Sequence, residues 1–246
     1  MTFHDIPRLR LGVYPTPIEE MPRLREALGG GPRLYIKRDD YSGLGFGGNK
    51  VRKLEYVFAE AQRTGVDTVL TIGGIRSNHA RVTAAIAAKL GLACHLILNG
   101  SSDDVPASRY LDELYGAVIH PVQLPKDRIP TMLEIAGKLQ AQGARTMEIP
   151  LGASDTLGAM GYVAAAEEIA AAGMKFDAIF HCTSSGGTHA GLDAGLQLFG
   201  LSDIRLIGVS PDESAGSICA HVAEIRDAIA ARLGINVTRP LNVDVV

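Results

Sequence analysis

The sequence predicts an α/β fold built on open, twisted, mostly parallel sheets with helices on both faces. Two observations carry the prediction: strand-like and helical segments alternate along most of the chain, and no flexible linker interrupts them. Strands that alternate with helices pair in parallel and are joined by right-handed crossovers. Ligands of such sheets bind at the carboxyl ends of the strands, where the chain enters a helix. The strand-to-helix loops are therefore the candidate sites.

The predicted elements begin with a short helix from Ile18 to Leu28, followed by a glycine-proline turn and a strand-like run over 33–38. A helix starts at Lys50, after a glycine-rich turn over 45–49. Further strands are expected at Thr68 to Ile72, Ala93 to Leu98, Ala117 to Val122, Arg145 to Ile149, Ala178 to Cys182 and Ile204 to Val209. Further helices are expected at Asn78 to Leu90, Ala107 to Tyr115, Thr131 to Gln142, Thr156 to Ala172 and Thr188 to Phe199.

Composition excludes several classes of protein. The net charge of −3 gives no reason to expect nucleic acid or an anionic membrane as a partner. No apolar run approaches the roughly 20 residues that span a bilayer, and the first ten residues lack the apolar core of a signal peptide. The three cysteines, Cys94, Cys182 and Cys219, fit neither a disulfide framework nor a zinc site. We therefore expect a cytoplasmic protein that needs no metal.

The first candidate loop, Gly45 to Lys53, runs from a glycine-rich turn straight into a helix. Asn49 is a natural N-cap, which places Lys50 at the first helical position beside unpaired backbone amides. Such a helix end favours an anion. A lysine there can pair with a phosphate as a point charge, or form a Schiff base with an aldehyde once its pKa is lowered. Alone, the loop is more typical of an ordinary surface lysine, because short glycine motifs match by accident.

The second loop, Gly73-Gly74-Ile75-Arg76-Ser77-Asn78-His79, also joins a strand to a helix. The amides of Ser77 to His79 are placed to bind a carboxylate, with the Ser77 hydroxyl free to act on a substrate. The alternative is that Ser77 or Asn78 only caps the helix, and that His79 packs on its neighbours.

The third loop, Cys182-Thr183-Ser184-Ser185-Gly186-Gly187-Thr188-His189-Ala190-Gly191, combines hydroxyls and glycine amides at a helix start, which suits a phosphate. It matches neither the P-loop nor the dinucleotide fingerprint. The alternative is an ordinary capped helix. His181 and His189 are interpreted as structural, because nothing pairs them with a nucleophile.

A lysine loop, a carboxylate-type loop and a phosphate-type loop on one α/β framework together point to pyridoxal 5'-phosphate. That cofactor needs a partner for its aldehyde, a site for its phosphate, and a group that holds the amino acid's carboxylate.

The order of the loops and their residue motifs resemble those of the 1-aminocyclopropane-1-carboxylate deaminase/D-cysteine desulfhydrase family of fold-type II pyridoxal-phosphate enzymes. The fold of that family is like that of tryptophan synthase β. The resemblance covers nearly the whole chain. Its most specific motifs are Ile36-Lys37-Arg38-Asp39-Asp40, Gly47-Gly48-Asn49-Lys50, Arg52-Lys53-Leu54-Glu55, Gly73 to His79, Gly152-Ala153-Ser154-Asp155, Leu157 to Tyr162 and Gly186 to Gly191.

The resemblance implies two domains and a role for each loop. The large cofactor domain would comprise 1–55 and 156–246, and the small domain 56–155. Lys50 would form the Schiff base, and Lys53 would help to bind the phosphate in a cradle of Ser185, Gly186, Gly187 and Thr188. Asn78 would contact the phenolic oxygen of the cofactor. Ser77, Asn78 and His79 would hold the substrate carboxylate, with Ser77 also catalytic.

Within that family, Ser-Asn-His is more similar to the D-cysteine desulfhydrases, because the cyclopropane deaminases usually carry Gln at the position of His79. The resemblance therefore implies a homodimeric lyase that converts D-cysteine to pyruvate, hydrogen sulfide and ammonia. A cyclopropane deaminase and a cysteate sulfo-lyase remain open as alternatives, as does a non-catalytic protein that binds a phosphorylated metabolite.

The carboxyl end departs from the family pattern. Members of the family continue beyond the point that corresponds to Val246, and that continuation supplies a tyrosine loop over the cofactor and a partner for the pyridine nitrogen. We therefore expect the large domain to lack its C-terminal part. An active enzyme and a weakly active or inactive truncated form are both compatible with this expectation.

Overall fold

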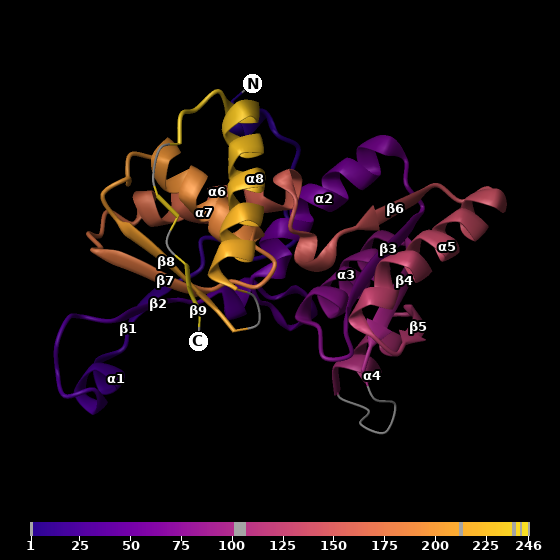
Figure 1. The fold of residues 1–246 in the computed structure, drawn as a ribbon, viewed down its shortest axis with the longest axis horizontal. Helices are drawn as coiled ribbons and strands as arrows, with labels where there is room; N and C mark the ends of the chain where they lie inside the picture. Colours follow the sequence, from indigo (N-terminus) through magenta and orange to yellow (C-terminus); the bar gives the residue numbers. More distant parts are fainter. Residues whose placement is uncertain (1, 101–106, 212–213, 238–239, 242, 246) are drawn as a thin grey trace.

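Two parallel sheets form the framework of the molecule, with α2 (Lys50–Thr64) between the lobes that contain them (Figure 1). The fold comes from a computed structural model, which describes residues 2–100, 107–211, 214–237, 240–241 and 243–245. The first sheet has the order β5-β4-β3-β6, with all four strands parallel. Its strands are β3 (Thr68–Gly74), β4 (Ala93–Asn99), β5 (Val118–Val122) and β6 (Thr146–Ile149).

Helices cover both faces of this first sheet. On one face, α3 (Asn78–Leu90) packs on alternate residues such as Val69 and Leu96, and α4 (Ala107–Leu114) lies beside α3. On the other face, α5 (Arg128–Ala141) packs on Leu70 and Ile97. Because successive side chains of each strand point to opposite faces, one apolar core lies on each face of the sheet.

The second sheet has the order β7-β8-β9, again all parallel, with β7 (Ala178–Cys182), β8 (Arg205–Ser210) and β9 (Val243–Val245). Three helices, α6 (Thr156–Ala171), α7 (Gly187–Leu198) and α8 (Ala215–Leu233), pack together in the same lobe (Figure 1). A separate antiparallel pair joins β1 (Ile18–Glu20) to β2 (Tyr35–Lys37). The alternation predicted from the sequence is therefore confirmed.

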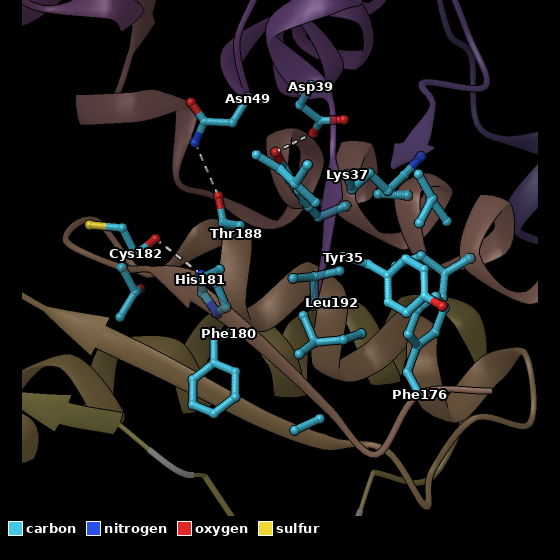
Figure 2. Close-up of a pocket in the computed structure, with 18 of the residues that line it drawn as sticks. Tyr35, Lys37, Asp39, Asn49, Phe176, Phe180, His181, Cys182, Thr188 and Leu192 are labelled. Carbon is cyan, nitrogen blue, oxygen red and sulfur yellow. Dashed lines mark hydrogen bonds between the residues drawn. The ribbon is translucent and has the colours of Figure 1, made fainter. Parts of the chain in front are cut away.

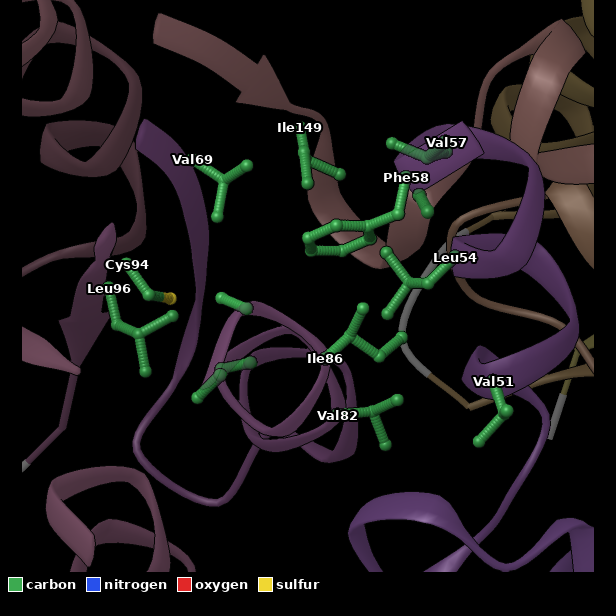
Figure 3. Packing of buried hydrophobic residues seen from close by; sticks show 14 of the residues in the cluster. Val51, Leu54, Val57, Phe58, Val69, Val82, Ile86, Cys94, Leu96 and Ile149 are labelled. Carbon is green, nitrogen blue, oxygen red and sulfur yellow. The ribbon is translucent and has the colours of Figure 1, made fainter. Parts of the chain in front are cut away.

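Helix α2 packs against elements of both lobes. Leu54 and Phe58 lie in the apolar core with Ile86 of α3, Val69 of β3 and Ile149 of β6 (Figure 3). On its other side α2 packs on α6, so closely that a Cβ on Gly161 would lie 2.4 Å from the carbonyl carbon of Arg52. Only glycine allows this approach, which fixes the first turn of α2 against α6.

Two local predictions need correction. The expected helix from Ile18 to Leu28 is instead β1 followed by the short helix α1 (Pro22–Ala27). Pro22 opens that helix, and its ring conflicts with a helical carbonyl four residues earlier, so no helix runs through from Ile18. Asn49 occupies the N-cap position of α2 but its side chain makes no capping hydrogen bond.

Helix α8 was not predicted, although the sequence carries signals for it. Ser214 caps its start by accepting from the amide of Ser217, and Gly234 follows its end with a positive φ. Ile218, Val222, Ile225 and Ile229 form the buried stripe between these caps.

The division into domains stays a proposal. Strands β3 to β6 all lie inside 56–155, and the other strands lie outside it, which is the arrangement that the proposed boundaries require.

Candidate active site

The three candidate loops lead into the amino ends of α2, α3 and α7. A cavity of about 1190 Å³ lies along β2 and β7 and reaches the ends of α2 and α7, where Lys50 and Ser185 line it. Cys182 and Thr188 line the same end (Figure 2). Helix starts carry unpaired amides and the positive end of the helix dipole, so the end of the cavity at Lys50 favours an anionic ligand.

Lys50 is the first residue of α2, as predicted, and is partly buried. Its Cε lies 3.4 Å from the position that a Cβ on Gly152 would occupy, and the Ser185 hydroxyl lies 2.6 Å from that same position. The side chain therefore extends between the 152–155 loop and the start of α7. Burial disfavours the ammonium form and lowers the pKa of Lys50 to about 8.

We expect Lys50 to react with an amine-specific reagent at a pH well below that needed for an ordinary lysine. Its pKa of about 8 lies below the usual value near 10.4, so the neutral, nucleophilic amine accumulates as the pH rises from 7 to 9. Labelling across a pH series, read peptide by peptide, gives the midpoint for each lysine. A midpoint for Lys50 that coincides with that of exposed lysines would contradict the prediction.

Lys53 lies one turn further along α2 and is fully buried. Its Nζ donates to the carbonyl of Gly152 at 3.1 Å and to the Ser154 hydroxyl at 2.9 Å. Within the described part of the chain it forms no ion pair with a carboxylate. Burial, and then the neighbouring Lys50, lower the pKa of Lys53 well below its usual value. A bound anion would supply the missing countercharge.

The start of α7 faces these lysines. A Cβ on Gly187 would lie 2.8 Å from Lys53 Nζ and 2.9 Å from the Ser154 Cα, so only glycine fits there. Gly186 occupies the N-cap position with φ 75° and provides no side-chain cap. The Ser154 hydroxyl donates to the Ser185 hydroxyl at 2.6 Å. Buried lysine amines, hydroxyls and an uncapped helix start thus meet at one place, which fits a phosphate group.

Thr188 lies in the first turn of α7, and its hydroxyl accepts a hydrogen bond from the Asn49 amide at 3.5 Å (Figure 2). The side chain expected to cap α2 therefore contacts the phosphate-type loop instead. The predicted residues Lys50, Lys53, Ser185, Gly186, Gly187 and Thr188 are all brought together.

In the second loop, Ser77 caps α3, because its hydroxyl accepts from the amide of Ala80 at 3.2 Å. Asn78 packs against the glycine turn, where its Nδ2 lies 2.7 Å from the position of a Cβ on Gly48. Its Oδ1 accepts from Arg81 at 2.6 Å, which leaves the Nδ2 amide to donate toward a ligand oxygen.

The imidazole of His79 is buried and points toward β3, where its Nε2 lies 2.7 Å from the Thr71 hydroxyl. Thr71 donates its only hydroxyl proton to the carbonyl of Ile149, so it must accept from His79 Nε2. His79 Nδ1 is then an unprotonated acceptor, and it has no partner among the described residues. Any contact of His79 with a carboxylate would therefore use its backbone amide.

The sequence motifs did not assign a role to Ser154, which joins Lys53 to Ser185 through hydrogen bonds. Its signal was the segment Gly152 to Asp155, which directly precedes the helix that Asp155 caps.

His181 and His189, interpreted as structural, contact each other at 3.1 Å, and burial lowers the pKa of His181 to about 4.

Neither a membrane-spanning helix nor a metal centre emerges from the described ranges. No helix there has the length and apolar character to cross a bilayer, and no three His, Cys, Asp or Glu side chains there gather as metal ligands.

Comparisons with known proteins identify relatives of this chain. Residues 9–246 match a family model described as "Pyridoxal-phosphate dependent enzyme". A D-cysteine desulfhydrase of Yersinia pestis (strain Pestoides F) is 42% identical over 246 residues, which cover 96% of this chain and 73% of that protein. A D-cysteine desulfhydrase of Salmonella choleraesuis (strain SC-B67) is 40% identical over 96% of this chain and 74% of its own.

Solved structures show the same fold. The crystal structure of an ACC deaminase homologue superposes with a TM-score of 0.93 and 35% sequence identity, over 99% of this chain and 74% of its own. A pyridoxal 5'-phosphate-dependent aspartate racemase, at 20% identity and a TM-score of 0.64, covers 80% of this chain and 57% of its own and shares the fold. By its family match and by its relatives, this chain belongs to the pyridoxal-phosphate dependent enzymes.

Proposed function

We propose that the protein is a D-cysteine desulfhydrase, which converts D-cysteine and water to pyruvate, hydrogen sulfide and ammonia. The observation that carries the proposal is the pair of desolvated lysines one turn apart on α2, beside the uncapped start of α7. The names of the relatives at 40 and 42% identity favour D-cysteine as the substrate.

Pyridoxal phosphate, when bound, forms a covalent bond with the substrate amine and delocalises the electron pair left by loss of the α-proton. Lys53, Ser185, Gly186, Gly187 and Thr188 would hold its phosphate. The low pKa of Lys50 leaves a share of its amine neutral near pH 7 to 8, so Lys50 Nζ can bond the aldehyde and afterwards accept the α-proton of the substrate. Asn78 would donate to the phenolic oxygen from Nδ2.

The amides of Ser77, Asn78 and His79 at the start of α3 would bind the substrate carboxylate. Ser77 would act on the substrate with its hydroxyl proton, because the cap uses only a lone pair of the oxygen.

Substitution of Ser77 separates its capping of α3 from carboxylate binding at the same helix start. Ser77→Ala is expected to lower the free energy of unfolding by about 1 kcal/mol through loss of the cap. Ser77→Asp keeps a capping side chain but sets a negative charge beside the substrate carboxylate, so KM should rise at least about tenfold while stability recovers. Denaturant unfolding and steady-state kinetics measure both effects. A wild-type KM in Ser77→Asp would contradict carboxylate binding at this helix start.

The substrate is tested by pyruvate release from D-cysteine, L-cysteine and cysteate, with α-ketobutyrate release measured for 1-aminocyclopropane-1-carboxylate. We expect D-cysteine to give the highest kcat/KM. A preference for the cyclopropane substrate would favour the alternative that the ACC deaminase homologue suggests. Inactivity on all four with cofactor attached at Lys50 would overturn the substrate but keep the cofactor site. A homodimer in the cytoplasm stays part of the proposal, and sedimentation of the purified protein tests the dimer.

A further inference from the structure

The turn that presents Lys50 is rich in glycine, and hydrogen bonds such as that from the Ser42 hydroxyl to the carbonyl of Gly48 hold it locally. Gly43, Gly45, Gly47 and Gly48 all have positive φ, between 62° and 101°, and Phe46 shares this conformation at 65°. Glycine loses more conformational freedom on folding than any other residue, so such a turn has a high entropic cost. The Asn49 side chain does not cap α2. Interactions from outside the turn therefore add to those within it in fixing the position of Lys50.

Arg52, two residues after Lys50, closes this turn. Its guanidinium is fully buried and binds Asp39 with two hydrogen bonds, Nε to Oδ2 at 2.9 Å and Nη2 to Oδ1 at 2.8 Å. Asp39 precedes the glycine turn and Arg52 follows it, so the pair joins the two ends of the segment that contains Lys50. The carbonyl of Asp39 also accepts from the amide of Gly48 at 2.9 Å.

Arg52 also ties α2 to α6. It donates to Glu168 through Nη1 at 2.7 Å and Nη2 at 2.9 Å. At the same place Gly161 of α6 lies against the backbone of Arg52. Helix α6 begins directly after the 152–155 loop, which contacts Lys53 and Ser185. The pairing with Glu168 therefore joins the lysine helix to α6, the helix that follows the 152–155 loop.

The surrounding groups hold both carboxylates in position. Tyr162 donates to Asp39 at 2.8 Å, and Lys37 donates to Glu168 at 2.7 Å. Two cations and two carboxylates balance within this cluster. The rigid fork of arginine can bind both carboxylates with paired hydrogen bonds, whereas a lysine at the same position offers only a point charge.

We propose that Arg52 is a positioning residue: its bridge between Asp39 and Glu168 holds Lys50 where its amine meets the aldehyde of pyridoxal phosphate. This inference rests on the proposed role of Lys50. It goes beyond that role because Arg52 is not among the residues that line the cavity, whereas its partner Asp39 and Lys50 are. The function of the cluster is thus to fix the conformation of the glycine turn and, with it, the position of Lys50.

The test compares Arg52→Lys with Arg8→Lys. Arg8 forms a similar ion pair with the buried Glu55 on the same helix, at 2.7 Å, but does not bridge the glycine turn. Each protein is incubated with pyridoxal 5'-phosphate, reduced with borohydride and digested, and the label at Lys50 is quantified against time and pH. Thermal unfolding of the same samples measures the loss of stability.

We expect labelling of Lys50 to slow about 10- to 100-fold in Arg52→Lys, with a shifted pH midpoint, because small displacements of a reacting group cost this much. Arg8→Lys should label within about twofold of the wild type, even where both variants lose similar stability. Equal labelling in the two variants would overturn the positioning role. Absence of label at Lys50 in the wild type would instead overturn the proposed function. If Arg52→Lys does not fold, Glu168→Gln removes one carboxylate charge at constant size and should still slow the labelling.

Discussion

Lys50→Ala is expected to abolish covalent retention of pyridoxal phosphate and to lower turnover of D-cysteine by at least about a thousandfold. The alanine side chain can neither bond the aldehyde nor accept the α-proton, and loss of a positioned proton-transfer group acts on this scale. Purified wild-type protein should absorb at roughly 410–430 nm after addition of the cofactor, and the variant should lack this band. Pyruvate release measures the loss of turnover. A band of wild-type intensity in the variant would place the attachment at another lysine.

Lys50→Arg is the matched control, because it preserves the positive charge at the helix start but cannot bond the aldehyde. If Lys50 is only a point charge for a phosphate, the arginine variant should bind inorganic phosphate as the wild type does. In that case the wild type has no turnover for a substitution at Lys50 to remove. The proposed function requires instead that Lys50→Arg be as inactive as Lys50→Ala. The comparison therefore separates an enzyme from a binding protein for a phosphorylated metabolite.

The helices that carry the site could be predicted from the sequence because their ends carry local signals. The expected range of α3 agrees with the structure at both ends, since Ser77 caps it and Gly91 follows it with φ 71°. Helix α6 begins at Thr156, as expected, after the capping residue Asp155. The meeting of the three loops could not be predicted from one sheet, because the strands before them, β2, β3 and β7, belong to three separate sheets, and the packing of α2 on α3 and α6 brings the loops together.

Interactions between distant segments could not be predicted in this way. Arg52 resembles a surface residue in the sequence, yet it is fully buried because Asp39 and Glu168, 13 and 116 residues away, both reach it. The role of His79 depended on Thr71 and Ile149, which fix its protonated nitrogen only after two strands and a helix have packed. Such side chains acquire their function from tertiary contacts that no local pattern records.

Lys53→Met should weaken the affinity for pyridoxal phosphate about 10- to 100-fold, because it removes from α2 a buried charged donor that faces the phosphate-type loop. A fluorescence or absorbance titration with the cofactor measures the change. Lys89→Met, at an exposed lysine in the last turn of α3, is the control and should bind as the wild type does. Equal affinity in both variants would show that Lys53 does not contact the phosphate.

The same substitution should also change how stability depends on pH when no ligand is bound. The pKa of Lys53 in the folded protein lies well below its value in the unfolded chain, so the unfolded chain binds more protons between the two values. The free energy of unfolding of the wild type should therefore fall as the pH drops from about 10.4 toward the folded pKa. Lys53→Met lacks this contribution, so its unfolding free energy should depend less on pH, whereas added phosphate should stabilise the wild type more than the variant. Urea unfolding at several pH values, with and without phosphate, measures both effects, and parallel pH profiles would mean that Lys53 keeps an ordinary pKa. Protonation of Lys53 is therefore unfavourable in the protein without ligand, and it becomes favourable when a bound phosphate supplies the countercharge.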